Sequence, residues 1–171
     1  MLQKYNIIVV FLIFIASCKP ESMQYSDIPA LNFNKVDQIL LNGKDSIVNI
    51  YVNYSDGDGD IGLNTNDTLA PYNFGSKYFH NLFIEIYKIE NGVSSKITLP
   101  FSSDTINFND RITNLTPTGK NKSISGEILL PINSSPYNGF VLDSIYYTIQ
   151  IVDRKLNLSN KVRTPALKFQ F

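Results

Sequence analysis

The sequence has few of the residues on which several common kinds of protein depend. It contains no tryptophan, one cysteine and one histidine in 171 residues. A lone cysteine cannot close a disulfide within the chain, and one cysteine with one histidine leaves a Cys/His zinc site poorly supplied. Basic and acidic side chains balance at 15 each, so the positive surface that nucleic-acid binding needs is missing. We therefore expect no nucleic-acid partner.

Length and composition predict one domain, and the absence of catalytic motifs argues against an enzyme. With 43% hydrophobic residues, the chain can bury a single core, and a two-domain enzyme is disfavoured. His80 stands at the start of an expected strand, and the sequence contains no nucleophile elbow and no phosphate-binding loop. Nothing indicates which of Glu85, Glu127 or the aspartates would act as an acid in apolar surroundings. We predict that the protein is not an enzyme.

The N-terminus has the layout of an export signal. Lys4 precedes the apolar run 7–15, which is too short to span a bilayer as a mature helix. The run leads into Ile15-Ala16-Ser17-Cys18, which resembles the bacterial lipobox, in which cleavage exposes a cysteine that takes lipid. The resemblance implies a signal peptide over 1–17 and lipidation of Cys18. Two lipid groups on that residue hold a protein to a membrane more securely than one acyl chain does.

The segment after the cysteine bears on location and domain limits. Residues 18–32 are polar and lack a clear period, so we expect a tether there and a folded domain over 33–171. Lys19 differs from the aspartate that retains lipoproteins in the inner membrane, so the outer membrane is favoured. Lys19-Pro20-Glu21 is similar to part of the export signal of Bacteroidota surface lipoproteins. Whether the domain faces the periplasm or the cell surface stays open.

Most of the remaining chain alternates between apolar and polar residues with period two. Val48, Ile50 and Val52 share one face of a predicted strand over 46–54. The other alternating runs lie at 82–89, 124–132, 145–151 and 167–171. Turn signals separate them: Asn42-Gly43, Asn91-Gly92, Thr118-Gly119 and Asn138-Gly139. About seven strands in one domain predict an all-β, immunoglobulin-like or fibronectin type III-like sandwich, with an up-and-down barrel as the alternative.

Residues 143–160 resemble the penultimate-strand region of bacterial immunoglobulin-like domains. There, an alternating strand with tyrosines runs into an aspartate, a short turn and an asparagine near a serine, as Tyr147, Asp153, Asn157 and Ser159 do in this chain. Leu156 stands where that pattern usually has glycine, and a residue with a side chain tolerates positive φ poorly. The resemblance implies a fold and no activity.

One loop concentrates negative charge. Asp56, Asp58, Asp60 and Asp67 follow the predicted strand that ends at Tyr54, and no lysine or arginine occurs between residues 44 and 77. Glycines between the first three aspartates let the backbone curl, so that their carboxylates can converge on a hard cation such as calcium. The alternative is a solvated acidic turn that binds no ion, because Asp and Gly are favoured in turns without any ion.

The spacing resembles the calcium-binding loop of an EF-hand. Asp56, Asp58 and Asp60 match ligand positions one, three and five, the Gly62 carbonyl matches seven, and Asp67 matches twelve. Ile61 replaces the usual glycine and no helix is expected nearby, so the similarity is to Asp-Gly-Asp loops of extracellular β proteins and of small Bacteroidota lipoproteins. Possible additional ligands are Asn64, Asp153 and Asn157. In an immunoglobulin-like sandwich the loop after the second strand and the loop before the last open at one end, which brings these regions together.

These patterns together predict a non-enzymatic lipoprotein of the cell envelope. It would be a binding or structural module anchored by lipid, with a structural calcium ion in the acidic loop. The alternative is an accessory polysaccharide-capture lipoprotein at the cell surface, because the ten tyrosines and eleven phenylalanines offer possible stacking faces for sugars. The partner, protein or glycan, is not identified by the sequence.

Overall fold

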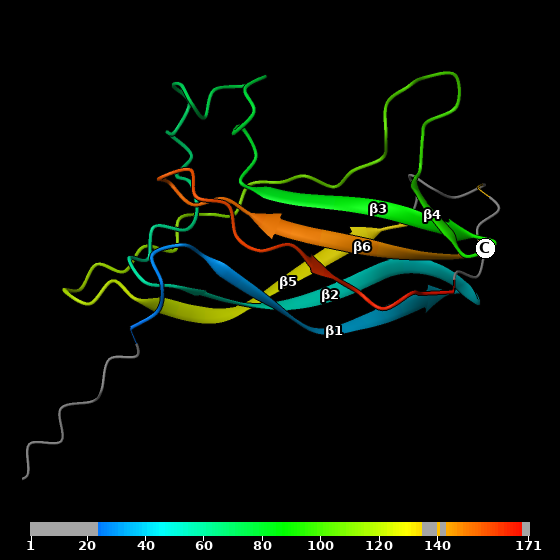
Figure 1. Cartoon of the computed structure of the whole chain (residues 1–171), viewed down its shortest axis with the longest axis horizontal. Helices are drawn as coiled ribbons and strands as arrows, with labels where there is room; N and C mark the ends of the chain where they lie inside the picture. Colours follow the sequence, from blue (N-terminus) through cyan, green and yellow to red (C-terminus); the bar gives the residue numbers. More distant parts are fainter. Residues whose placement is uncertain (1–23, 135–139, 141–142, 169–171) are drawn as a thin grey trace, which may run out of the picture.

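The part of the chain described by the computed structural model is all β (Figure 1). It comprises residues 24–134, 140 and 143–168. Its strands are β1 (Ala30–Leu41), β2 (Lys44–Asp56), β3 (Leu82–Glu90), β4 (Val93–Lys96), β5 (Ile124–Asn133), β6 (Ser144–Ile151) and β7 (Val162–Arg163). Within the described ranges, no helix has the length and apolarity that a membrane span needs. Cys18 and the predicted signal peptide lie outside these residues.

The strands form two antiparallel sheets. One sheet has the order β1-β2-β5 and the other the order β4-β3-β6-β7. Pairing of β2 with β1 and β5, of β3 with β6 and of β6 with β7 is the pattern of an immunoglobulin-like sandwich. The prediction of an all-β sandwich with about seven strands is confirmed.

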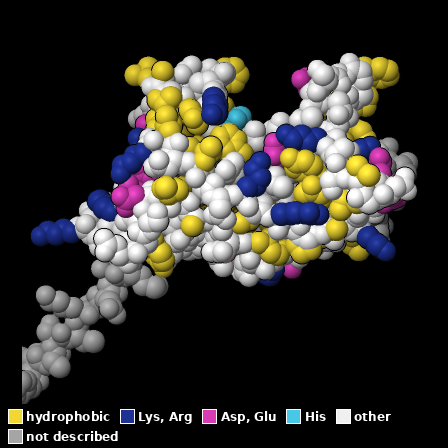
Figure 2. Space-filling model, in the orientation of Figure 1, with side chains coloured by type: hydrophobic (Ala, Val, Ile, Leu, Met, Phe, Trp, Pro, Cys, Tyr) yellow, Lys and Arg dark blue, Asp and Glu magenta, His cyan; other side chains and the backbone are white. Residues whose placement is uncertain are grey.

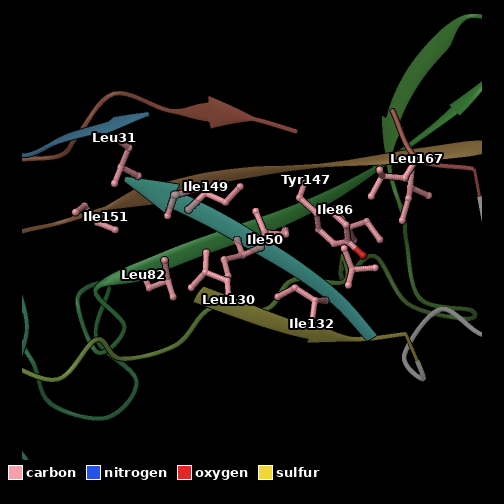
Figure 3. Packing of buried hydrophobic residues seen from close by; sticks show 14 of the residues in the cluster. Leu31, Ile50, Leu82, Ile86, Leu130, Ile132, Tyr147, Ile149, Ile151 and Leu167 are labelled. Atoms are coloured by element: carbon pink, nitrogen blue, oxygen red, sulfur yellow. The ribbon is translucent and has the colours of Figure 1, made fainter. Parts of the chain in front are cut away.

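The core lies between the two sheets, where the period-two faces meet. Val48, Ile50 and Val52 of β2 are fully buried, as the alternation predicts. Figure 3 shows how the two sheets contribute to one cluster, which includes Ile50, Leu82, Ile86, Leu130, Ile132, Tyr147, Ile149 and Ile151. This continuous apolar layer fixes the ends of β2 and β6. The aspartate-rich turn follows the end of β2, and the turn that contains Asp153 follows the end of β6.

Two of the predicted turns are tight hairpins. Asn42 and Gly43 have φ of 54° and 78° between β1 and β2, and Asn91 and Gly92 have φ of 50° and 78° between β3 and β4. Positive φ at both central residues is what a two-residue hairpin loop requires. Asn-Gly adopts this conformation at low cost, which explains why this dipeptide marked both turns.

The sandwich begins and ends differently from the sequence prediction. β1 starts at Ala30, before the expected domain start at residue 33, because Leu31 packs in the core and is only 1% exposed. At the other end, the last strand is β7, which lies before Pro165. The predicted alternating run at 167–171 contributes one bridge, between Leu167 and Ile145, and its residues 169–171 lie outside the described residues.

Two segments project from one side of the sandwich. Figure 1 shows the connection 64–79 at the upper left and the loop 97–105 at the upper right. Leu69 and Phe74 in the first are 80% and 86% exposed, and Phe101 in the second is also exposed. Figure 2 shows apolar side chains at both tips. Both projections therefore present apolar groups to solvent.

Candidate metal centre

The acidic turn begins at the last residue of β2. Asp56 pairs with Ile124 of β5, so its backbone is held by the sheet and its side chain is fully buried. The chain then passes very close to neighbouring backbone. A Cβ on Gly59 would lie 1.9 Å from the Lys122 carbonyl oxygen. These approaches leave no space for a side chain, so glycine is required there by sterics as well as by the turn.

The residues that follow Asp60 are buried and hydrogen-bonded to the segment 112–115. Ile61 and Leu63 are buried, and their carbonyl oxygens accept hydrogen bonds from Leu115 and Asn114. Ile61 therefore serves as a core residue where an EF-hand loop has its glycine. Gly62 has φ of 97°, and a Cβ there would meet the Thr113 carbonyl oxygen at 2.2 Å. The aspartate segment is consequently a fixed turn.

The turn after β6 meets the acidic turn. Asp153 forms a bridge with Ile61, and the Arg154 amide donates a hydrogen bond to the Asp60 carbonyl oxygen at 3.2 Å. Asp153 is only 1% exposed. Asn157 donates its backbone N–H at 2.7 Å and its side-chain amide at 2.8 Å to the two carboxylate oxygens of Asp153. The sandwich topology thus brings Asp153 to the aspartates, and Asn157 orients it.

Three carboxylates converge at this junction. One oxygen each from Asp56, Asp60 and Asp153 lies within 4.8 Å of the others. Oxygens that bind one calcium ion at about 2.4 Å lie at most about 4.8 Å apart, so this spacing is compatible with a shared cation. The group combines the turn after β2 with the turn after β6.

Several carboxylate oxygens of the aspartate segment have no hydrogen-bond partner. Among the described residues, Asp56 Oδ1, Asp58 Oδ1 and Asp60 Oδ1 are buried and unpaired. The second oxygen of Asp56 accepts the Asp60 N–H at 2.9 Å. A buried carboxylate oxygen without a donor costs free energy, and carboxylates that share a site repel one another. A bound cation removes both costs, which an ordinary solvated turn would not incur.

Burial and mutual repulsion disfavour ionisation of these groups. Burial is the main cause that raises the pKa of Asp56 to about 7, and the nearby Asp58, Asp60 and Asp153 raise it further. Burial also raises the pKa of Asp60 to about 6, with Asp153 and Asp58 adding to the shift. At neutral pH, positive charge at this place therefore stabilises the ionised aspartates.

The other predicted ligands have partners of a different kind. Asp67 binds the Arg154 guanidinium at 2.6 Å, and this hydrogen bond is the main reason that its pKa is lowered. The second oxygen of Asp58 pairs with Lys155. Neither Asp67 nor Asp58 is therefore one of the three grouped carboxylates, although the other oxygen of Asp58 is buried and unpaired.

Gly62 and Asn64 also make other contacts. The Gly62 carbonyl lies 3.5 Å from an Arg154 nitrogen. The Asn64 side-chain oxygen accepts a hydrogen bond from the Asn114 amide at 3.1 Å. Of the residues that match EF-hand ligand positions, Asp56 at position one and Asp60 at position five belong to the carboxylate group. Asp153 completes the group from a distant strand end.

Arg154 and Lys155 are site residues that the sequence prediction missed. They follow Asp153 directly, yet they supply counter-ions to Asp67 and Asp58 from the opposite part of the chain. In the sequence these residues are visible only as the run Asp153-Arg154-Lys155. Their role as counter-ions arises because the turn after β6 meets the turn after β2. The aspartate loop therefore has tertiary counter-ions at its edge. Among the described residues the grouped Asp56, Asp60 and Asp153 form no ion pair, although the nearby Lys155 partly offsets the rise in the pKa of Asp60.

Neither a protein-family model, nor a curated protein sequence, nor a solved structure matches the chain. The donor set itself identifies the kind of ligand. All grouped atoms are carboxylate oxygens, which suit a hard cation and not a metal that prefers sulfur or imidazole. The junction of Asp56, Asp60 and Asp153, hereafter the acidic junction, can therefore hold a metal ion.

Proposed function

We propose that this protein is a non-enzymatic, lipid-anchored lipoprotein of the cell envelope whose domain is stiffened by calcium at the acidic junction. The three buried, unpaired oxygens of Asp56, Asp58 and Asp60 are the observation that carries the calcium part. Calcium accepts six to eight oxygen ligands in irregular geometry, so it can use grouped carboxylates together with the free oxygen of Asp58. The ion would be structural and would join the turn after β2 to the turn after β6.

The lipid anchor is supported by the sequence alone. Cys18 is the only cysteine and follows an apolar run and two small residues, which is the lipobox pattern. With a diacylglycerol and an amide-linked acyl chain on Cys18, the domain would be tethered to the outer membrane. The partner would be a protein or glycan of the envelope.

A non-enzymatic role is supported by the state of the candidate acids and bases. Lys96 and Lys161 bind the Glu85 carboxylate, whose pKa is lowered to about 2, so Glu85 is ionised at neutral pH. Glu127 accepts a hydrogen bond from the Asn34 amide. His80 packs its ring against Phe79 with centroids 4.9 Å apart. Each group has a structural contact that accounts for it.

Thermal unfolding with and without calcium tests the metal part. At a calcium concentration a hundredfold above Kd, we expect about 2.7 kcal/mol of stabilisation and an increase in Tm of roughly 5–10 °C over protein in chelator. Magnesium at the same concentration should produce a smaller shift because it requires a stricter octahedral site. An unchanged Tm at 10 mM calcium, at about pH 7.5, would refute the proposed site, since extracellular calcium modules bind at about 10⁻⁴–10⁻³ M.

Asp60→Asn gives the test a specific signature. The substitution should abolish the calcium response and should also raise Tm in chelator, because it removes one charge from a group of buried like charges. Asp104→Asn, in an exposed loop, is the matched control and should leave the calcium response intact. A calcium shift that survives Asp60→Asn would place the ion elsewhere.

Metabolic labelling with a fatty-acid probe tests the anchor. The wild-type chain should incorporate label and fractionate with the outer membrane. Cys18→Ala should lose the label and stay with its leader uncleaved. Labelling that persists in Cys18→Ala, or a wild-type protein without label, would contradict the lipoprotein assignment.

A further inference from the structure

The outer face of the sheet β4-β3-β6-β7 contains a cleft of about 240 Å³, and none of its lining residues belongs to the acidic junction. Its lining includes Lys77, Phe83, Glu85, Asn107, Gln150 and Lys161. Phe83 and Glu85 alternate along β3 with the buried residues Leu82, Ile84 and Ile86, which places them on the solvent side of the sheet. The proposed calcium ion does not use this cleft.

The shape and size of the cleft suit one unit of a longer ligand. Drug-sized ligands occupy pockets of about 300–1,000 Å³, so 240 Å³ is small for a complete free ligand. Lys77, Asn107 and Lys161 are exposed at its margin, so a chain can enter and leave along the surface. These features favour a single residue of an extended polymer.

The lining combines an apolar face with amide groups. Phe83 is half-buried and offers a ring to the cleft. Asn107 and Gln150 carry amides, which can both donate and accept hydrogen bonds. The Gln150 amide donates to the Ser159 carbonyl oxygen at 2.7 Å, which holds this side chain in place beside the cleft. A sugar ring presents an apolar C–H face and a rim of hydroxyl groups, so it matches this mixture of an aromatic surface and amides.

The charge of the cleft is positive. Glu85 is the carboxylate of its lining, and it is bound by Lys96 at 2.6 Å and by Lys161 at 3.1 Å. Lys77 is in no ion pair among the described residues, and its ammonium lies 4.9 Å from the centre of the Tyr78 ring. Arg163, next along β7, stacks on Tyr146 at 3.6 Å. The two lysines and one glutamate of the lining leave one net positive charge, which a carboxylate on the ligand complements.

We propose that this cleft binds a carboxylate-bearing sugar residue, a uronate, within an extended acidic glycan, with Phe83 beneath the sugar ring, Lys77 and Lys161 on its carboxylate and the Asn107 and Gln150 amides on its hydroxyls. This assignment goes beyond the proposed structural role of calcium and does not require it. It gives the domain a ligand class of its own.

Calorimetry and affinity electrophoresis with the full chain, in detergent and at 1 mM calcium, test the assignment. The probes are three unsulfated uronate polymers, hyaluronan, chondroitin and heparosan, each paired with its carboxyl-reduced form. We expect binding to at least one acidic polymer, a loss of affinity of at least tenfold on carboxyl reduction, and weaker binding at higher salt. Failure of all three acidic polymers to bind would overturn the assignment.

Variants separate the cleft from general surface charge. Lys77→Gln with Lys161→Gln should weaken binding at least tenfold, and Asn107→Ala should weaken it several-fold without a change of charge. Lys44→Gln, on β2 in the opposite sheet, is the matched control and should bind as the wild type does. Unchanged affinity in the double lysine variant would refute the cleft as the site.

Poly-glutamate distinguishes a sugar from an acidic peptide. An acidic peptide supplies carboxylates but no hydroxylated ring for Phe83 and the amides, so we expect it to bind at least tenfold more weakly than the best uronate polymer. Equal affinity for poly-glutamate would overturn the sugar assignment. Repeating the glycan titration in chelator separates this proposal from the calcium proposal. If calcium fails to change Tm, the calcium proposal fails, but glycan binding should persist both with and without chelator.

Discussion

At the scale of single residues, the acidic junction is a place where charge and burial conflict. Asp56 is fully buried, and its Oδ1 has no hydrogen-bond partner among the described residues. Asp153 is held by two hydrogen bonds from Asn157, so it cannot turn away without losing them. The protein thus retains a costly arrangement of carboxylates, and such an arrangement is explained by a ligand that compensates its charge.

Leu156 is a second residue under strain, in the turn that presents Asp153. Its φ is 68°, in the left-handed region, and its N–H donates to the Asp153 carbonyl oxygen at 3.2 Å. For residues other than glycine and asparagine, this conformation costs about 1–2 kcal/mol. The turn therefore takes the shape that glycine would favour, although the chain places leucine there.

We predict that Leu156→Gly stabilises the domain by about 0.5–1 kcal/mol, because relief of the backbone strain exceeds the entropy that glycine adds to the unfolded chain. Equilibrium denaturation in urea measures this change. Leu158→Gly is the control, since Leu158 is exposed without positive φ, and it should destabilise by about 0.5–1 kcal/mol. Equal destabilisation by both substitutions would show that side-chain packing of Leu156 outweighs its strain.

At the scale of elements, the connection between β2 and β3 is ordered by contacts to distant segments. Arg111 donates hydrogen bonds to the carbonyl oxygens of Phe79 at 2.8 Å and Asp67 at 3.1 Å. Tyr72 donates its hydroxyl to the Arg154 carbonyl oxygen at 2.5 Å. The exposed tip that carries Leu69 and Phe74 is thereby fixed to Arg111 and to the turn after β6.

The turn between β6 and β7 sets how available Asp58 is to a cation. Lys155 pairs with one oxygen of Asp58, while the other oxygen is buried and unpaired. We predict that Lys155→Met tightens calcium binding several-fold, because the lysine no longer competes for Asp58 and no longer repels the ion. Isothermal titration calorimetry gives the Kd directly.

Lys88→Met provides the matched control for that prediction. Lys88 pairs with Glu90 at 2.9 Å, at the end of β3 remote from Leu82 and the junction, and the substitution removes the same charge. Calcium affinity should change by less than twofold in this variant. A similar gain in both variants would mean that net charge, and not release of Asp58, controls the affinity.

At the scale of the whole molecule, the raised pKa values make stability depend on pH. In the metal-free protein, the pKa of Asp56 is about 7 and that of Asp60 about 6, against an ordinary aspartate value near 4. Between about pH 4 and 7 the folded state therefore holds protons that the unfolded chain has released. The free energy of unfolding must then fall as pH rises through this window.

We predict that Tm in chelator decreases as pH rises from 5 to 8, and that saturating calcium abolishes this decrease because it favours the ionised carboxylates. Calorimetry at several pH values, with and without calcium, measures both effects. Glu85 has a lowered pKa and loses its stabilising contribution only as pH falls below about 4.5, outside this window. A metal-free Tm that is highest at pH 8 would contradict buried, repelling aspartates.

The sequence predicted the central strands because each has one unbroken alternating face. β2, β3, β5 and β6 keep a constant parity of apolar residues, whereas β1 does not. Register shifts between Phe33 and Lys35 and between Ile39 and Leu40 change which parity faces inward along β1. β4 is exposed at every position, so it has no apolar face to detect. Local patterns reveal strands only where burial follows a simple period.

The acidic segment itself was visible in the sequence because Asp56, Asp58 and Asp60 are neighbours along the chain. Asp153 could be predicted as an additional ligand because the topology of an immunoglobulin-like sandwich brings the two loops to one end. The use of Asp67 was not, because its partner Arg154 is 87 residues away and the pair forms only when the two turns meet. Linear spacing from a helical calcium loop cannot describe a site whose third carboxylate comes from another strand end.

The sequence by itself determined the class of fold, the hairpin turns at Asn42 and Asn91, and the concentration of aspartates after β2, since alternation, turn propensity and local charge are properties of neighbouring residues. Only the tertiary structure decided which carboxylates meet, which are paired with Arg154 and Lys155, and where the outer face of β3 forms a basic cleft. Those features depend on distances between strands far apart in the chain, which are fixed by packing of the two sheets.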